Sequence, residues 1–206
     1  MVDESAELGS GTFDGPLSTL RAVATALETA GARYFVGGSL ASSLQGIPRS
    51  TQDVDLVADL AAQSVEVFVR ALGAGFYADS ERIRDGIARL ASFNVIDLRN
   101  GFKADIYLAV DDAFGRAQLE RSQRVEVEPG LTLPFASAED VVLQKLRWYH
   151  LGGGVSERQW LDALGVLKVQ GARLDRAYLE RWASALDLAD LLARLREDAG
   201  SEGSKV

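Results

Sequence analysis

Apolar residues recur along this chain with two spacings, which predict alternating helices and strands in the first two thirds. From 16 to 31 they return every three or four positions, as in a helix with one buried face. Tyr34–Val36 is instead a short apolar run that ends at Gly37-Gly38, as expected of a buried strand. Helical spacing returns over Leu40–Gln45, and a turn follows at Gly46-Ile47-Pro48.

The next strand carries two acidic residues on one face. Successive side chains on a strand point to opposite sides, so Asp53 and Asp55 share a face while Val54 and Leu56 take the other. A later pair of alternating runs, 90–98 and 102–110, is joined through Asn100-Gly101, a strong two-residue hairpin signal. These two runs are therefore expected to be antiparallel neighbours.

From Ser137 onward the spacing is helical throughout. Expected helix starts are Ser137, Ser156, Asp175 and Asp187, and three glycines over 152–154 separate the first helix from the second. The predicted class is α+β, with a small mixed or antiparallel sheet flanked by helices and followed by a C-terminal helical bundle. We expect a flexible N-terminus over 1–15, an α/β core over 16–135, a helical subdomain over 136–198 and a flexible tail over 199–206.

The amino-acid composition excludes several kinds of active site. The 206 residues include no cysteine and one histidine, His150, which excludes zinc–thiolate sites, cysteine nucleophiles and multi-histidine metal sites. The net charge of −8 disfavours a broad nucleic-acid groove, although a local basic rim could still bind RNA. No apolar run is long enough to span a membrane, and the absence of cysteine suits the cytoplasm, where we expect the protein.

The Gly37-Gly38-Ser39 turn and the Asp53/Asp55 strand together suggest a site for a phosphorylated ligand. Two carboxylates on one face repel each other unless a cation lies between them, and hard divalent ions prefer oxygen ligands. Glycines at a helix start allow a phosphate to approach free backbone N–H groups. The alternative is a solvated acidic strand end beside an ordinary glycine turn.

The combination of strand, Gly-Gly-Ser, helix, turn and Asp-x-Asp resembles the signature of the nucleotidyltransferase fold, the superfamily of DNA polymerase beta. The run from Arg49 to Asp55 and the segment around Lys145 most resemble AbiEii-like and uncharacterised bacterial nucleotidyltransferases of the toxin–antitoxin type. The family has a third carboxylate on a neighbouring strand; Asp105, which has apolar flanks, is preferred here over Asp97. The implied residues are Asp53, Asp55 and Asp105 for catalysis and metal binding, and Gly37, Gly38, Ser39, Arg49, Thr51, Lys145 and Arg158 for nucleotide binding.

Several of these residues have a simpler explanation. For Arg49, a surface charge that ties down its turn is an equally good explanation. For Lys145, the less favoured alternative is a solvated lysine on an outer helix face. Arg158 and Asp162 lie one helical turn apart, so an ion pair within the helix is expected for Asp162. The candidates for base stacking, not ranked by the sequence, are Tyr34, Trp148 and Tyr149.

The resemblance implies a metal-dependent enzyme that moves a nucleoside monophosphate from a nucleoside triphosphate, such as ATP, to a hydroxyl. Two Mg²⁺ ions, replaceable by Mn²⁺, are the implied cofactors. The acceptor is a tRNA, a protein or a small molecule, and a cognate toxin or antitoxin is the implied protein partner. Two alternatives are a catalytically idle nucleotide- or partner-binding module and, less favoured because histidine ligands are missing, a phosphohydrolase.

Overall fold

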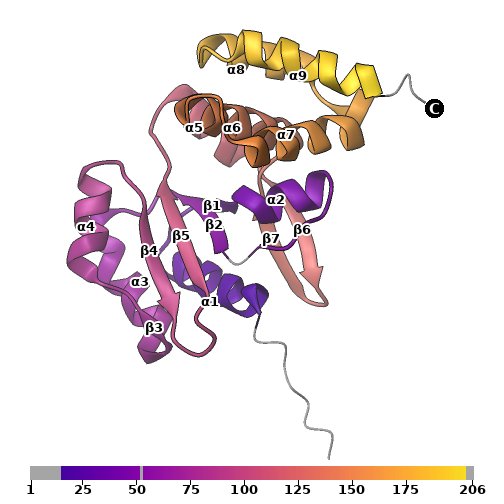
Figure 1. The fold of residues 1–206 in the computed structure, drawn as a ribbon. Coiled ribbons are helices and arrows are strands. Elements are labelled where there is room, and N and C mark those ends of the chain that lie inside the picture. The colour runs from indigo at the N-terminus through magenta and orange to yellow at the C-terminus, as the bar shows by residue number, and fades with distance from the viewer. Residues whose placement is uncertain (1–14, 52, 203–206) are drawn as a thin grey trace, which may run out of the picture.

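The computed structural model describes residues 15–51 and 53–202, and its centre is a seven-stranded mixed sheet (Figure 1). The strands lie in the order β3-β4-β5-β2-β1-β7-β6. Their bounds are β1 (Tyr34–Val36), β2 (Asp53–Ala58), β3 (Phe76–Tyr77), β4 (Phe93–Asp97), β5 (Lys103–Leu108), β6 (Gln123–Glu128) and β7 (Leu131–Phe135). The predicted α+β class is confirmed.

Helices lie on both sides of this sheet. Figure 1 shows α1, α3 and α4 together on one side, and α6 to α9 gathered on the other. The helices are α1 (Pro16–Thr29), α2 (Gly38–Gln45), α3 (Val65–Leu72), α4 (Ser80–Ala88), α5 (Ala113–Arg121), α6 (Ala138–Leu151), α7 (Glu157–Gln170), α8 (Arg176–Ala185) and α9 (Ala189–Glu202). Short 3₁₀ turns lie at 62–64, 73–75 and 171–173.

The two ends of the chain were expected to be flexible. Most of the segment 1–15 and the end of the segment 199–206 lie outside the described residues. Helix α9 runs on to Glu202, so it enters the segment assigned to the tail. Within 15–51 and 53–202, no helix has the length and apolar character needed to cross a membrane.

The register of the central strands places acidic residues side by side. Strand β2 alternates in burial because Val54, Leu56 and Ala58 face the core under α1. The other face of β2 carries Asp53 and Asp55. Strand β5 runs parallel to β2, and Asp105 is directly opposite Asp55. The expectation that the strand of the third carboxylate lies beside the strand of the first two is therefore met.

The predicted hairpin is also present, and it explains why Asp97 is not part of this acidic group. Strands β4 and β5 are antiparallel, and Gly101 turns between them with φ +77°. Asp97 is fully buried on the opposite face of the sheet from Asp105. Its carboxylate accepts hydrogen bonds from Thr19 of α1 at 2.9 Å and from Arg99 at 2.6 Å. Asp97 therefore joins the hairpin to α1.

The helix starts follow the sequence in part. Asp175 accepts a hydrogen bond from the Tyr178 N–H at 3.0 Å, and Ser137 accepts one from the Asp140 N–H at 3.2 Å. Ser156 makes no side-chain cap bond. Asp59 caps no helix: it accepts from the N–H and side chain of Arg33, and α3 begins at Val65.

Helix α7 holds the C-terminal helices against the core. Gln170 at its end donates to the Gln45 carbonyl at the end of α2 at 2.7 Å. Gly165 has no side chain where Ile47 packs, and a Cβ there would lie 3.3 Å from that isoleucine. This close approach brings the middle of α7 next to the loop that precedes β2, and it sets the position of the site.

Candidate active site

The start of α2 and the middle of β2 touch each other. Gly38 has φ +54°, and a Cβ at this position would lie 1.9 Å from Asp55 Oδ2, so only glycine fits. The Ser39 N–H hydrogen-bonds the Asp55 carboxylate. Unpaired N–H groups at a helix start attract anions. The glycine turn therefore places the N-terminal end of α2 directly beside an acidic side chain.

The acidic residues of β2 and β5 differ in their surroundings. Burial raises the pKa of Asp55, and the neighbouring Asp105 carboxylate raises it further. Lys103, which shares its face of β5 with Asp105, pairs with that carboxylate at 2.7 Å. Asp53 lies at the exposed start of β2. One half-buried pair and one exposed carboxylate thus line this edge of the sheet.

A divalent cation suits this donor set, but the side chains are not assembled around one. Hard cations prefer carboxylate oxygens, which is what Asp53, Asp55 and Asp105 offer. Among residues 15–51 and 53–202, no group of three Asp, Glu, His or Cys side chains is placed so that it could bind one metal ion. The Lys103 ammonium already supplies a positive charge at Asp105. A metal bound by Asp105 would therefore displace this lysine.

Three charged side chains meet opposite the helix start. Asp162 of α7 accepts from Lys145 Nζ of α6 at 2.7 Å and from Arg49 Nε and Nη2 at 2.9 Å each. Arg49 also donates to the Ser39 hydroxyl, and Ser42 of α2 lies 3.3 Å from Asp162. Both cations therefore lie next to the start of α2, and Asp162 holds them there.

The protonation of this group follows from its burial. Burial lowers the pKa of Lys145, and the hydrogen bond to Asp162 opposes that shift. Burial also raises the pKa of Asp162, but the hydrogen bonds from Arg49 and Lys145 outweigh this effect and hold it below its ordinary value. Asp162 is therefore a carboxylate at neutral pH.

The structure excludes the alternative given for Lys145 and the expectation given for Asp162. Lys145 is not a solvated lysine on an outer face, because only 5% of the residue is exposed. Asp162 pairs with Lys145 and Arg49 rather than with Arg158 of its own helix. Arg158 is exposed and lines the same cavity. Its spacing from Asp162 suggested an intrahelical pair, whereas the packing of α7 on α2 gave that carboxylate other partners.

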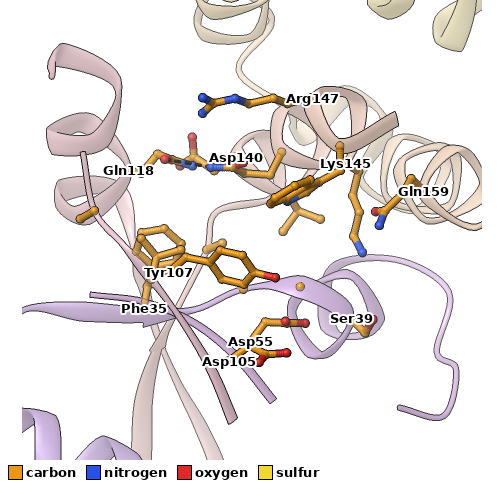
Figure 2. A pocket seen from close by; sticks show the side chains of 18 of the residues that line it. Phe35, Ser39, Asp55, Asp105, Tyr107, Gln118, Asp140, Lys145, Arg147 and Gln159 are labelled. Atoms are coloured by element: carbon orange, nitrogen blue, oxygen red, sulfur yellow. Dashed lines mark hydrogen bonds between the residues drawn. The ribbon is translucent and has the colours of Figure 1, made fainter. Parts of the chain in front are cut away.

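These features line one cavity of about 770 Å³, between the sheet on one side and α5, α6 and α7 on the other. Every residue predicted for the site lies on its wall, including Thr51, whose hydroxyl donates to the Asp53 carbonyl at 3.1 Å. Figure 2 shows Ser39 and Lys145 near one end, Gln118 at the other, and Asp55 and Asp105 between them.

Part of the wall was not predicted. Tyr107 lines the cavity, and its alternation with Asp105 on β5 was a signal that could have found it. Asp140, Gln118 and Gln144 also line it, and nothing in their spacing pointed to a ligand.

Of the three candidates for base stacking, only Trp148 lines the cavity. Tyr34 hydrogen-bonds Glu28, and Tyr149 packs on Trp160 with ring centroids 5.0 Å apart.

Comparison with solved structures identifies this architecture. A solution structure of the antibiotic-resistance factor ANT(2'')-Ia matches with a TM-score of 0.51 and 16% identity, over 82% of this chain and 94% of that one. A crystal structure of ANT(2'')-Ia in complex with adenylyl-2''-tobramycin matches with a TM-score of 0.50 and 12% identity, over 83% and 96%. A putative nucleotidyltransferase from Thermotoga maritima, TM1012, matches at 0.47 with 20% identity, over 71% and 92%.

No protein-family model matches the sequence, and no curated protein matches it either. At these identities the matches define the fold and not the activity. The α+β fold of this chain, with its seven-stranded mixed sheet, is therefore shared with ANT(2'')-Ia. It is the nucleotidyltransferase fold that the sequence motifs suggested.

Proposed function

We propose that this chain is a metal-dependent nucleotidyltransferase that moves a nucleoside monophosphate from a nucleoside triphosphate to a hydroxyl acceptor. The observation that supports this most is the pairing of Asp55 and Asp105 in register on parallel strands, beside the helix start at Ser39. Acidic ligands for a cation and a backbone anion site then face one cavity together with Lys145. Such a set suits a substrate that combines a metal with phosphates.

Each group has a distinct role in this proposal. The N–H groups at the start of α2 bind the terminal phosphates, and Lys145 and Arg49 neutralise their charge. Asp53, Asp55 and Asp105 would hold the divalent ions, which neutralise charge on the phosphates and acidify a bound hydroxyl. Asp105 orients the acceptor and takes its proton. The acceptor oxygen bonds to the α-phosphorus, the bond to the β-phosphate breaks, and pyrophosphate leaves.

A second candidate function is a catalytically idle nucleotide- or partner-binding module. The observation that favours it is the ion pair of Lys103 with Asp105 at 2.7 Å, because a bound lysine competes with a metal for that carboxylate. Nucleotide binding without transfer to any acceptor would support this reading.

The biological setting that we propose is a toxin–antitoxin or related defence system in the cytoplasm, with a cognate toxin or antitoxin as partner. The resemblance to AbiEii-like proteins is the support for it. For the acceptor, ANT(2'')-Ia bound to an adenylylated tobramycin makes an aminoglycoside a useful probe beside tRNA and protein.

A labelling screen tests the proposal. Purified protein with Mg²⁺ or Mn²⁺ is given each α-labelled nucleoside triphosphate, together with cell lysate, total tRNA, an aminoglycoside panel or no addition. Asp55→Asn keeps the shape of the side chain and should reduce label transfer about a thousandfold or more. Asp111→Asn is the matched control, because its side chain is 93% exposed and lies outside the cavity.

The outcomes separate the candidates. Label transfer that is lost in Asp55→Asn and kept in Asp111→Asn supports nucleotidyl transfer and names the acceptor. Equal transfer by both variants would refute the assignment of Asp55. Metal-dependent nucleotide binding without transfer in any mixture would favour the idle module.

A further inference from the structure

The cavity continues beyond the acidic residues into a second region, the inner lobe, lined by Phe35, Tyr107, Gln118, Val141, Gln144 and Trp148. Along each strand the lining changes from acidic to apolar or aromatic. Val57 follows Asp55 on the same face of β2, and Tyr107 follows Asp105 on β5. Phe35 of β1 is in register with Val57. The floor of the inner lobe is therefore apolar and aromatic.

Helix α6 covers the inner lobe. Val141, Gln144 and Trp148 recur with helical spacing on the stripe that also carries Lys145. The rings of Trp148 and Tyr107 lie 5.7 Å apart at 59°, and Trp148 is 46% exposed. Two aromatic side chains, one from the roof and one from the floor, thus border the inner lobe and leave ring surface for a further flat group.

Gln118 of α5 provides a polar contact at the far end. This residue is 3% exposed, and its Nε2 has no hydrogen-bond partner among the described residues. Its Oε1 accepts from Gln144 Nε2 at 3.2 Å, which holds the amide in place. A buried amide donor without a partner costs about 1–3 kcal/mol and is rare in native proteins. A ligand with a hydrogen-bond acceptor would satisfy it.

Two acidic residues line the cavity around the inner lobe. Asp112, just before α5, is exposed and accepts from the Gly115 N–H at 2.7 Å through Oδ1. Asp140, the buried acid beside the inner lobe, accepts from the Tyr178 hydroxyl at 2.8 Å through one oxygen and from the Ser137 hydroxyl at 2.7 Å through the other. The six side chains that define the inner lobe carry no charge, so they themselves offer nothing that pairs with a polyamine or an aminoglycoside. Aromatic walls with one amide donor suit an uncharged planar heterocycle.

We propose that the inner lobe binds the base of the nucleoside triphosphate, with Gln118 donating a hydrogen bond to an acceptor on the edge of the base. This inference rests on the proposed function. Figure 2 supports the arrangement: Ser39 and Lys145 lie toward one end of the cavity, Gln118 toward the other, and Asp55 with Asp105 between. A nucleotide with its terminal phosphates at Ser39 and its base at Gln118 spans the acidic residues. The acceptor then enters at the exposed Asp53 end.

Binding measurements on the full chain with Mg²⁺ test this assignment. Calorimetry compares α,β-methylene analogues of ATP, GTP, CTP and UTP, which cannot release pyrophosphate, with inorganic tripolyphosphate, which has no base. Wild-type protein should bind at least one analogue tenfold or more tighter than tripolyphosphate, given about 1–3 kcal/mol per stacked base. Gln118→Leu should weaken that analogue by about 2- to 10-fold, and Trp148→Ala by about 5- to 100-fold.

The affinity for tripolyphosphate distinguishes a failure of this inference from a failure of the proposed function. Its affinity should stay unchanged in Gln118→Leu and Trp148→Ala, whereas Lys145→Ala should weaken both kinds of ligand. Gln123→Leu, exposed on β6 outside the cavity, is the matched control and should change neither.

Nucleotide affinity that survives Gln118→Leu and Trp148→Ala but not Lys145→Ala would overturn the base assignment and leave the proposed function intact. Failure of every phosphate ligand to bind wild-type protein would overturn both.

Discussion

Asp162→Ala is expected to destabilise the fold by about 3–5 kcal/mol, because two cations lose the carboxylate that they share. Lys145 Nζ lies 2.7 Å from Asp162, and the two side chains are only 6% and 7% exposed. Arg49 reaches the same carboxylate at 2.9 Å but is 26% exposed, so it can turn toward water. Most of the cost therefore comes from Lys145, which stays buried without this partner.

The pH dependence of this loss identifies its cause. Burial lowers the pKa of Lys145 and Asp162 opposes the shift, so the variant lowers that pKa further. A lysine whose pKa is lower in the folded than in the unfolded chain destabilises the fold while it is protonated. This destabilisation disappears as the pH rises toward the pKa of the unfolded chain, about 10.4. The deficit should therefore be full near neutral pH and shrink at alkaline pH. It should also shrink below about pH 4, where wild-type Asp162, whose own pKa is lowered, becomes protonated in turn.

Urea unfolding followed by circular dichroism at pH 7 and pH 9.5 measures both effects. Lys145→Met in the Asp162→Ala background removes the stranded charge and should recover most of the loss. Glu180→Ala is the control: its pair with Arg196 spans 2.9 Å, but the two side chains are 60% and 36% exposed, so at most about 1 kcal/mol is expected. A loss below about 1 kcal/mol in Asp162→Ala, or no recovery in the double variant, would refute the reasoning.

Four further outcomes are expected. Asp55→Asn should abolish transfer yet unfold at an equal or higher temperature, because burial raises the pKa of Asp55 and makes its charge unfavourable in the fold; a lower melting temperature would contradict this. Nucleotide affinity should fall at alkaline pH, below the ordinary lysine range, because burial lowers the pKa of Lys145, and Lys145→Arg should remove that fall. Gly38→Ala should reduce activity far more than Gly31→Ala. Both glycines have positive φ, but only at position 38 would an added Cβ clash with a carboxylate, so equal activities would argue against the clash. Lys103→Met should lower the Mg²⁺ concentration for half-maximal activity; an unchanged requirement would mean that this lysine does not compete with metal.

Local patterns in the sequence were sufficient for the elements that position the acidic residues. The alternation of β2 and the Asn100-Gly101 turn define which side chains share a face, and both depend only on backbone geometry and neighbouring residues. The pairing of Asp55 with Asp105 came from the family resemblance, and the register confirms that the two strands are adjacent. The roles of these residues in catalysis and in metal binding remain proposals.

Predictions were weaker wherever a side chain had a choice of partner. Asp162 could pair within its helix or across to other elements, and spacing alone favoured the nearer arginine. Asp59 could cap a helix, but Arg33, just before β1, is its partner. In both cases the contact that forms joins residues far apart in the chain, and a local sequence pattern cannot predict such a contact.

The sequence by itself thus determined the class of the fold, the helix start at Gly37-Gly38-Ser39 and the acidic face of β2, because each depends on short-range periodicity and turn chemistry. Only the tertiary structure decided that Asp162 holds Lys145 and Arg49 beside that helix start, and that α5 and α6 close the inner lobe around Gln118. The reason is physical: burial and ion pairing arise when distant segments pack, and their energies depend on which groups that packing removes from water.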